Sequence, residues 1–373
     1  MRLGLDYTSA LRQGAGIGRY TRGIVGALAD LDHDNQYTLV VARDVGDLPG
    51  IGSGNMRFRR LPLSEWSLTI AWHRLRLPIY VDAFTGPLDI FHSPDFVLPP
   101  VRRARTIVTV HDLSFLRYPQ CAARGLVAYL STVVPRSLRR ADLILADSAW
   151  TRQDIIAMLG MPAKKILVVP AGVGPEYQPI ADEAVLSVVR QRYHLPERFI
   201  LHVGTLEPRK NLVRLMEALR AISAQEPETK LVLVGGKGWL YEDIFTNVER
   251  LGLAGKVIFP GYIAEADLPA VYNLAAVFAY PSLYEGFGIP PLEAMACGVP
   301  VVSSNSSSLP EVVGDAALLV EPTDNDALAA ALLRALSDQS LRQVLRQRGF
   351  ERVRQFSWPA AAEKLLKAYL SLV

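Results

Sequence analysis

Two glutamates eight positions apart, Glu285 and Glu293, are the first candidates for chemistry in this chain. They flank a Gly-Phe-Gly turn in the stretch SLYEGFGIPPLEAMACG, and the proline pair after that turn suits the start of a helix. One interpretation is helix capping and turn formation. The other is a binding site, because carboxylates accept hydrogen bonds from sugar hydroxyls and the first amides of a helix can donate to an anion. Glu293 lies among apolar helix residues where capping needs no carboxylate, which favours the binding site.

A second candidate is the cation pair Arg209-Lys210, which directly precedes a predicted helix that Asn211 can cap. Two positive charges at a helix N-terminus oppose the helix dipole, at about 0.3–1 kcal/mol each. A bound diphosphate would reverse that effect, because Arg can form a bidentate hydrogen bond with phosphate and Lys contributes a compact positive charge. Solvated surface charges are the alternative.

The first half of the chain offers a glycine-rich turn and a histidine. Gly14, Gly16 and Gly18 follow an apolar run and precede a helix, an arrangement that lets backbone amides approach a phosphate or a sugar. A turn without a ligand is the alternative. A dinucleotide fingerprint with Asp44 as its ribose-binding acid fails on the glycine spacing. His111 ends a buried strand, where it either contacts a ligand or is satisfied by a neighbouring residue.

Metal chemistry finds little support in the sequence. The two D-x-D matches, Asp32-His33-Asp34 and Asp324-Asn325-Asp326, lie in polar turns and are interpreted as turn and capping residues. Cys121 and Cys297 are the only cysteines, and the six histidines have no metal-ligand spacing. We therefore expect no metal and no cofactor, and a reducing cytoplasm as the location.

The elements that must position these residues form an alternating pattern of β-rich apolar runs and helical stretches. Such a pattern predicts parallel sheets covered on both faces. With 373 residues, the chain is long enough for two α/β domains, 1–170 and 196–356, joined by a Gly- and Pro-containing linker at 171–195. The predicted strands are 2–7, 37–43, 89–93, 105–112, 142–148 and 165–170 in the first half, and 198–205, 230–236, 256–261, 277–282, 300–305 and 317–322 in the second.

Charge is unevenly distributed along the chain. Residues 56–140 carry thirteen Lys and Arg against five Asp and Glu, an excess of eight, interleaved with Trp66, Trp72 and leucines. This mixture suits an anionic membrane surface, and a solvated protein face is the alternative. The sequence shows no membrane-spanning apolar run, secretory signal or nucleic-acid-binding module, so we expect a cytoplasmic protein with a peripheral contact to the inner membrane face and no nucleic-acid partner.

The motifs PSLYEGFGIPPLEAMACGVPVV, GTLEPRKN, GYIAEADLPAVYNLA, SSLPEVVGDAALLVEP and VHDLSF occur in an order that resembles retaining glycosyltransferases of family 4. The resemblance covers essentially the whole chain. It implies the GT-B fold, in which two doubly wound Rossmann-like α/β domains face each other across a cleft. It also implies that a C-terminal helix, 357–373, crosses back to the first domain, which would be the acceptor side.

The same resemblance implies a role for each matching residue of the second domain. Glu293 would bind the nucleotide ribose, and Arg209 with Lys210 would neutralise the diphosphate. Tyr262 would lie against the base. Glu285 would hold the transferred sugar together with the backbone of Phe287, Gly288 and Ile289.

Three further positions complete the implied site. His111 would contact the sugar near the reacting carbon, and Gly16 and Gly18 would let the first loop approach donor and acceptor. Thr205 stands where several relatives have an arginine, so the diphosphate contact would depend on Arg209 and Lys210, and Thr205 is counted among the donor-binding residues.

The implied reaction moves a hexose from a nucleotide-diphosphate sugar to a hydroxyl of a glycan or a lipid-linked acceptor, with retention at the anomeric carbon. The amino-acid sequences of these motifs resemble those of bacterial mannosyltransferases of surface polysaccharide synthesis. GDP-mannose is therefore the expected donor, with UDP-sugars as the alternative. The motifs give less support to a nucleotide-sugar epimerase, a phosphorylase or a non-catalytic sugar-binding protein.

Overall fold

The computed structural model describes residues 1–14, 16–50 and 52–373. The chain folds into two compact units. The first comprises 1–113, 125–172 and 356–373, and the second comprises 114–124 and 173–355. The boundary near residue 172 falls at the Gly- and Pro-containing segment.

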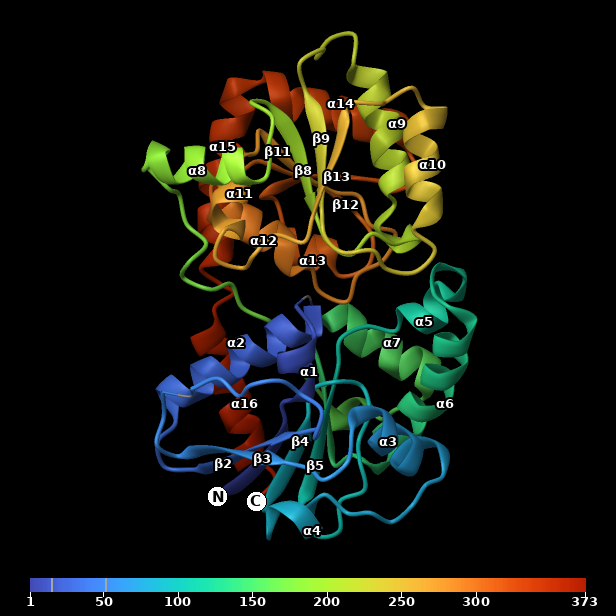
Figure 1. Cartoon of the computed structure of the whole chain (residues 1–373), viewed down its shortest axis with the longest axis vertical. Coiled ribbons are helices and arrows are strands. Elements are labelled where there is room, and N and C mark those ends of the chain that lie inside the picture. The colour runs from blue at the N-terminus through green and yellow to red at the C-terminus, as the bar shows by residue number, and fades with distance from the viewer. Residues whose placement is uncertain (15, 51) are drawn as a thin grey trace. The chain divides into compact units, whose positions relative to one another are not determined.

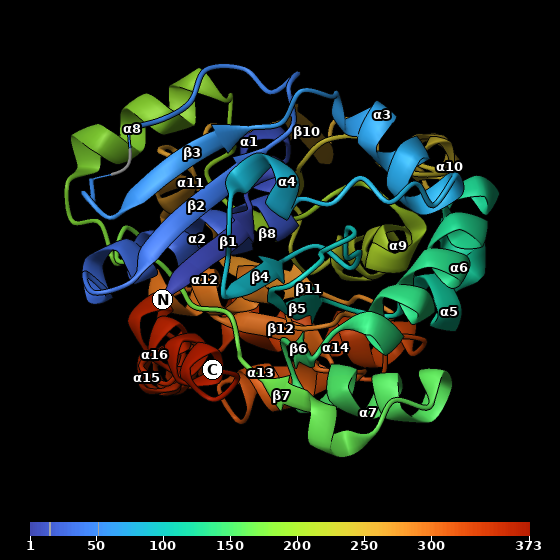
Figure 2. The ribbon, with the colours of Figure 1, turned by 90° about the horizontal axis from the view of Figure 1, so that it is seen from below.

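The first unit is built on a seven-stranded, fully parallel sheet with the order β3-β2-β1-β4-β5-β6-β7, which can be followed across Figure 2. Strand order reverses between β1 and β4, as in doubly wound α/β folds, which bind ligands at that reversal. The strands are β1 (Arg2–Asp6), β2 (Gln36–Val41), β3 (Met56–Arg60), β4 (Ile90–Ser93), β5 (Arg105–Val110), β6 (Leu143–Ala146) and β7 (Ile166–Val168).

The sequence did not predict β3. Its residues read MRFRR, with a single large aromatic side chain at Phe58, and lack the apolar run that marked the other strands. β3 is an edge strand, and edge strands commonly carry charged side chains. Met56 is its one buried side chain, so its sequence shows no continuous apolar run. Phe58 pairs in register with Leu39 of β2 and its ring packs 5.7 Å from that of Tyr7. Part of the basic stretch at 56–140 is therefore an edge strand.

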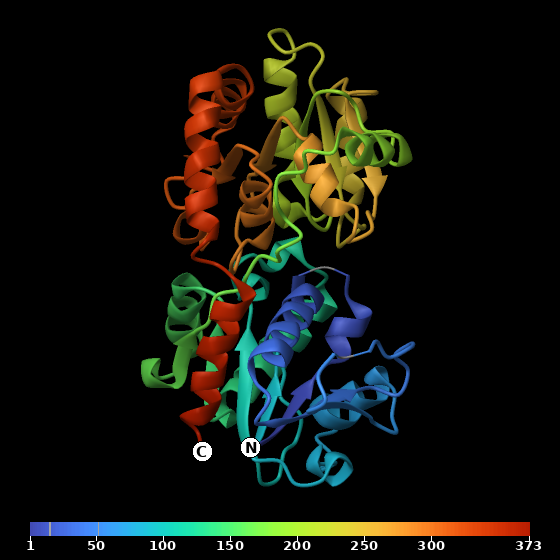
Figure 3. The same ribbon diagram turned by 90° about the vertical axis from the view of Figure 1, so that its left-hand side faces the viewer.

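The C-terminal helix α16 (Trp358–Leu370) belongs to the first unit, as expected, and lies beside α2 (Gly16–Leu31) (Figure 3). A Cβ atom on Gly23 would overlap the indole of Trp358, so glycine is what allows the two helices to approach. The hydroxyl of Tyr369 on α16 forms a hydrogen bond of 2.8 Å with Nδ1 of His92, which lies on β4. These contacts fix the chain terminus on the first unit.

The other helices of the first unit are α1 (Thr8–Arg12), α3 (Glu65–Thr69), α4 (Asp82–Thr85), α6 (Arg124–Arg140) and α7 (Ala149–Leu159). A five-residue π-helical turn, Ile70–Arg74, continues α3. Of the helices in the described residues, none combines the length and apolar character that a membrane crossing requires.

The second unit has a six-stranded parallel sheet with the order β10-β9-β8-β11-β12-β13 and helices on both sides (Figure 1). Its order again reverses once, between β8 and β11, which confirms two doubly wound α/β domains. The strands are β8 (Phe199–Val203), β9 (Lys230–Val234), β10 (Val257–Gly261), β11 (Val277–Tyr280), β12 (Val301–Ser304) and β13 (Ala317–Val320). The helices are α5 (Ser114–Arg117), α8 (Glu183–Arg192), α9 (Leu212–Ile222), α10 (Glu242–Arg250), α11 (Leu268–Leu274), α12 (Ile289–Ala296), α13 (Leu309–Val313), α14 (Asn325–Ser337) and α15 (Gln339–Val353).

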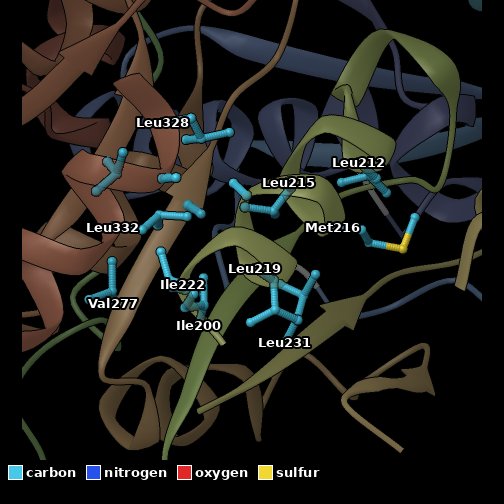
Figure 4. Close-up of a cluster of buried hydrophobic side chains, with 14 of the residues drawn as sticks. Ile200, Leu212, Leu215, Met216, Leu219, Ile222, Leu231, Val277, Leu328 and Leu332 are labelled. Atoms are coloured by element: carbon cyan, nitrogen blue, oxygen red, sulfur yellow. The ribbon is translucent and has the colours of Figure 1, made fainter. Parts of the chain in front are cut away.

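The hydrophobic core of the second unit anchors α9. Leu212, Leu215, Met216, Leu219 and Ile222 recur at helical spacing and are almost fully buried. They form one cluster with side chains of β8, β9 and α14 (Figure 4). This packing fixes the N-terminal end of α9. The Arg209-Lys210 pair directly before it is thereby held near the carboxyl end of β8.

Two local expectations need correction. Asn211 does not cap α9: it adopts a left-handed conformation with φ of 59°, and its side-chain amide donates to the carbonyls of Pro281 and Pro322 at 3.1 and 2.7 Å. The segment 171–195 is not simply a linker, because it contains α8, which packs on α11.

Candidate functional site

The loop after β8 carries the first residues of the site, and the loop after β9 holds it in place. Gly204 and Leu206 donate backbone hydrogen bonds to Val234 and Gly236 at 2.9 Å each. A Cβ atom on Gly235, whose φ is 146°, would overlap the carbonyl oxygen of Gly204. Only glycine allows these two loops to lie so close, and the result is a rigid platform at the carboxyl ends of β8 and β9.

Arg209 and Lys210 form a 3₁₀ turn on this platform, and both reach Glu285, which follows β11. Arg209 Nη1 lies 2.8 Å from Glu285 Oε2, and Lys210 Nζ lies 2.6 Å from Glu285 Oε1. Arg209 Nη2 also contacts Glu207 Oε1 at 2.6 Å. Lys210 donates to the hydroxyl of Tyr280 at 3.1 Å. β8 and β11 are neighbours in the sheet, which is why residues about 75 positions apart meet here.

This cluster consists of two cations and two carboxylates, and each of the four side chains is at most 14% exposed. Burial alone would raise the pKa of Glu285, but the charges of Arg209 and Lys210 outweigh it and lower that pKa to about 2. Glu285 is therefore an ionised hydrogen-bond acceptor at any physiological pH, and a poor proton donor.

A group of serines at the end of β12 and directly after it positions the Glu285 loop. Ser307 Oγ accepts the backbone N–H of Glu285 at 2.8 Å, and Ser308 Oγ lies 2.9 and 2.8 Å from the carbonyl oxygens of Glu285 and Phe287. Ser304 and Ser306 bond to the backbone carbonyls of the residues just before it in the same way. The sequence did not indicate these serines as positioning residues, although their regular contacts with one loop fix the carboxylate's place.

Helix α12 begins directly after this loop. Gly288, at φ of 114°, precedes its first residue, Ile289, and a Cβ atom there would press on the side chain of Leu309. Phe287 is buried. The N-cap position is Gly288, which has no side chain to cap the helix. The two prolines after Ile289 have no N–H, so the amides that this helix end can offer a ligand are those of Gly288 and Ile289.

Glu293 lies within α12 and is only 1% exposed. Its Oε2 accepts a hydrogen bond of 2.7 Å from the hydroxyl of Tyr272 on α11. The structure thus gives Glu293 a buried protein partner that the sequence did not indicate, and its contact with a ribose stays a prediction.

The two remaining donor-site predictions of the second unit are Tyr262 and Thr205. Tyr262 follows β10 and is 63% exposed, and its contact with the base stays a prediction. Thr205 belongs to the rigid β8 loop, with its methyl group beside Gly238.

In the first unit the glycine-rich turn leads into α2. Gly16 is its first residue, with φ of 35°, and a Cβ atom on Gly18 would overlap the backbone of Gln13. Chain packing is therefore sufficient to require glycine at position 18, and the approach of this loop to donor and acceptor stays a prediction. Asp44 is engaged elsewhere: its carboxylate pairs with Arg12 and accepts the backbone N–H of Glu65 at 2.9 Å, as the failed glycine spacing suggested.

His111 follows β5, and both of its ring nitrogens have partners. Nδ1 lies 2.7 Å from Asp147 Oδ2, and Nε2 lies 2.7 Å from the carbonyl oxygen of Pro94. Burial opposes a charged ring, but the Asp147 carboxylate prevails and raises the pKa of His111 to about 9. The ring is thus an imidazolium that ties the ends of β4, β5 and β6 together, and Asp147 is a partner that the sequence did not identify.

The structure therefore brings Glu285, Arg209 and Lys210 into one cluster and places Glu293 on the adjoining helix. Gly16, Gly18 and His111 lie in the first unit. The D-x-D matches are structural: Asp32 accepts bonds from Asn35 and Tyr37, and Asp324 caps α14. In the described part of the chain, no three His, Cys, Asp or Glu side chains gather as metal ligands would.

Known protein families and structures agree with this two-domain architecture. Residues 190–352 match the family described as glycosyl transferases group 1, and residues 15–172 match the glycosyl transferase 4-like domain. The chain is 39% identical over 282 residues to O-antigen chain mannosyltransferase B of Escherichia coli, covering 75% of this chain and 74% of that protein. It is 35% identical over 221 residues to a GDP-mannose-dependent alpha-(1-6)-phosphatidylinositol monomannoside mannosyltransferase of Mycolicibacterium smegmatis, covering 55% and 57%.

Sucrose-phosphate synthase from Thermosynechococcus elongatus has a similar structure, with a TM-score of 0.79 at 25% identity over 100% of this chain and 99% of that one. Two doubly wound parallel sheets, the match to the group 1 family model and the similarity to this structure define a glycosyltransferase of the GT-B fold. The chain belongs to the glycosyl transferases group 1 family, and it is an enzyme that moves a sugar.

Proposed function

We propose that the enzyme transfers mannose from GDP-mannose to a hydroxyl group of a glycan or lipid-linked acceptor, with retention at the anomeric carbon. The observation that carries this proposal is the buried cluster of Arg209, Lys210 and Glu285 at the carboxyl ends of β8 and β11. The names of the two mannosyltransferase relatives, one of them GDP-mannose-dependent, favour mannose and GDP over other sugars and bases.

In this proposal the second unit holds the donor. Arg209 and Lys210 contact the diphosphate and stabilise the charge that grows on it as it leaves. Glu285, ionised by its two cations, accepts hydrogen bonds from the sugar hydroxyls, and the α12 amides at Gly288 and Ile289 add donors. Glu293 accepts from the ribose, and Tyr262 stacks on the base.

The bond between the anomeric carbon and the diphosphate oxygen breaks, and a bond to the acceptor oxygen forms on the same face of the sugar. The acceptor proton passes to an oxygen of the departing diphosphate. Glu285 is not the nucleophile, because its charge is already shared by Arg209 and Lys210. The reaction as proposed uses no metal and no cofactor.

A titration of the whole chain with GDP, UDP and ADP, followed by thermal unfolding, tests the nucleotide assignment. A ligand present at a hundred times its dissociation constant stabilises the state it binds by about 2.7 kcal/mol. We expect selective stabilisation by GDP that is lost in Glu293→Ala. Stabilisation by UDP alone would replace GDP-mannose with a UDP-sugar, and no response to any nucleotide would contradict the donor site.

We further propose that the enzyme works at the inner face of the cell membrane, through the surface around α3. Trp66 is 73% exposed, and residues 74–78 form an exposed run that alternates arginine and leucine before a proline. Arginine beside exposed apolar side chains suits an anionic lipid surface.

Sedimentation with vesicles that contain phosphatidylglycerol tests this surface. We expect binding that falls in the double variant Arg74→Gln/Arg76→Gln and persists in Lys364→Gln/Lys367→Gln, which removes the same charge from α16. Binding that is equal for all three proteins, or independent of anionic lipid, would overturn the membrane proposal.

A further inference from the structure

Glu207 is part of the cation cluster. It lies within the GTLEPRKN motif, but the sequence indicated no role for its carboxylate. It directly precedes the 3₁₀ turn Pro208–Lys210, and its backbone carbonyl accepts the N–H of Lys210 at 3.1 Å. Its side chain is 10% exposed and turns back onto Arg209, with 2.6 Å between Oε1 and Nη2. The carboxylate thus occupies one side of the guanidinium that the proposed function assigns to a diphosphate.

The two carboxylates of the cluster, Glu207 and Glu285, differ in the cations that they contact. Glu285 contacts both Arg209 and Lys210, and its backbone is anchored by Ser307 and Ser308. Glu207 makes its ion pair with Arg209. Loss of Glu285 would leave two buried cations poorly compensated, whereas a phosphate oxygen placed against Arg209 could substitute for Glu207 alone.

Charge balance favours that substitution. Arg209 and Lys210 carry two positive charges, and Glu207 with Glu285 carries two negative ones, so the cluster is neutral without a ligand. A diphosphate brings about two more negative charges into a region where interactions are poorly screened. Its attraction to Arg209 is therefore opposed by the nearby Glu207 carboxylate.

The backbone around Glu207 cannot easily move away. Leu206 is held by hydrogen bonds to Gly236 and from Gly238, at 2.9 and 3.0 Å. A Cβ atom on Gly238 would lie 3.4 Å from Cβ of Glu207, so the two loops are in contact. Any exchange of partners on Arg209 must come from rotation of the Glu207 side chain.

We propose that Glu207 is a resident anion that occupies Arg209 in the empty site, yields that position to the diphosphate of the donor, and returns as the nucleoside diphosphate leaves. This inference rests on the proposed donor site. Glu207 thereby weakens nucleotide binding and speeds product release, while Glu285 remains in place for the sugar.

The test uses Glu207→Gln in the full chain, with inorganic pyrophosphate and GDP as probes in calorimetric titrations. We expect both to bind at least about fivefold more tightly than to the wild type, and GDP to dissociate more slowly. Glu226→Gln is the matched control, since Glu226 is also a largely buried partner of an arginine, Arg198, in the same unit. Its affinities should equal those of the wild type.

Unchanged or weaker binding of pyrophosphate to Glu207→Gln would overturn the inference and make Glu207 an orienting partner of Arg209. Glu207→Asp, which keeps the charge, should retain wild-type affinity, and circular dichroism checks that each variant folds. In an Arg209→Met background the effect of Glu207→Gln should vanish, because the guanidinium that the two anions share is gone. The pyrophosphate result does not depend on the base, so a failure of the GDP assignment is distinguishable from a failure of this inference.

Discussion

Replacing Glu285 by glutamine tests whether the buried cluster is held together by charge. The variant keeps the size of the side chain and its hydrogen-bonding ability, but leaves Arg209 and Lys210 with Glu207 as the remaining carboxylate of the cluster. The pKa of Glu285 lies at about 2, against an ordinary value of 4.5. A difference of that size corresponds to roughly 3 kcal/mol of stabilisation at neutral pH, and breaking a buried ion pair typically costs about 3–5 kcal/mol.

The pH dependence follows from the sign of this shift. Because the folded-state pKa is depressed, the stabilisation is fully present above the unfolded pKa of 4.5 and is lost as pH falls toward 2. About 2 kcal/mol of it should be gone at pH 3. Glu285→Gln lacks this titration, so its stability deficit should shrink between pH 7 and pH 3.

Urea unfolding of the wild type and the variant, followed at both pH values, measures the effect. We expect the variant to lose about 3 kcal/mol at pH 7 in the transition of the second unit. Glu197→Gln is the control, because Glu197 is 89% exposed in its ion pair with Arg190 and should change stability by less than about 1 kcal/mol. A variant as stable as the wild type at pH 7, or with the same pH dependence, would refute this account of the cluster.

Three further predictions concern the surroundings of the site. Tyr272→Phe removes the hydroxyl that donates to buried Glu293, and should cost about 1–3 kcal/mol in urea unfolding and weaken GDP binding in the same preparation. Burial opposes charge on His111, but Asp147 raises its pKa to about 9, so the pair contributes stability that is complete below the ordinary pKa of 6.5 and is lost as pH rises through 9; His111→Gln should flatten that decline in a series of melting curves. Leu215→Ala leaves a cavity in the α9 core and should cost about 2–5 kcal/mol by urea unfolding, and a loss below about 1 kcal/mol would mean that the core collapses around it.

Local pattern was sufficient to predict both sheets, because continuous apolar strands alternating with helices leave few other ways to bury so much apolar surface. It failed at β3, where an edge position makes MRFRR acceptable as a strand. It failed also at α8, because the segment EAVLSVVRQR within the predicted linker forms a helix that buries Leu186 and Val189 and packs on α11.

The site was partly predictable for a related reason. Glu285, Arg209 and Lys210 stand at strand ends, and strand ends of a parallel sheet share one edge, so their proximity follows from the pattern. The contacts of Glu207 and of the serines at the end of β12 and directly after it depend on side-chain direction and on which strands are neighbours. Neither the side-chain direction nor the order of strands in the sheet can be inferred from the spacing of residues in the sequence.

The same limit explains the first unit. His111 was recognisable as a strand-end residue, but Asp147 follows a different strand, β6, which lies beside β5 only once the sheet is formed. The packing of Trp358 on Gly23 joins the two ends of the chain, and the motif resemblance indicated the returning helix without indicating this contact.

Sugar transfer itself is the most direct test of the proposed function. The wild type and Lys210→Ala are each incubated with GDP-mannose, UDP-glucose or ADP-glucose and an octyl α-mannoside acceptor, and the products are followed by NMR spectroscopy. We predict that the wild type forms an α-linked octyl dimannoside and one GDP per mannose from GDP-mannose alone, and that Lys210→Ala loses most of this turnover. Transfer from UDP-glucose instead, a β-linked product, or full activity in Lys210→Ala would contradict the proposed donor, stereochemistry or phosphate site respectively.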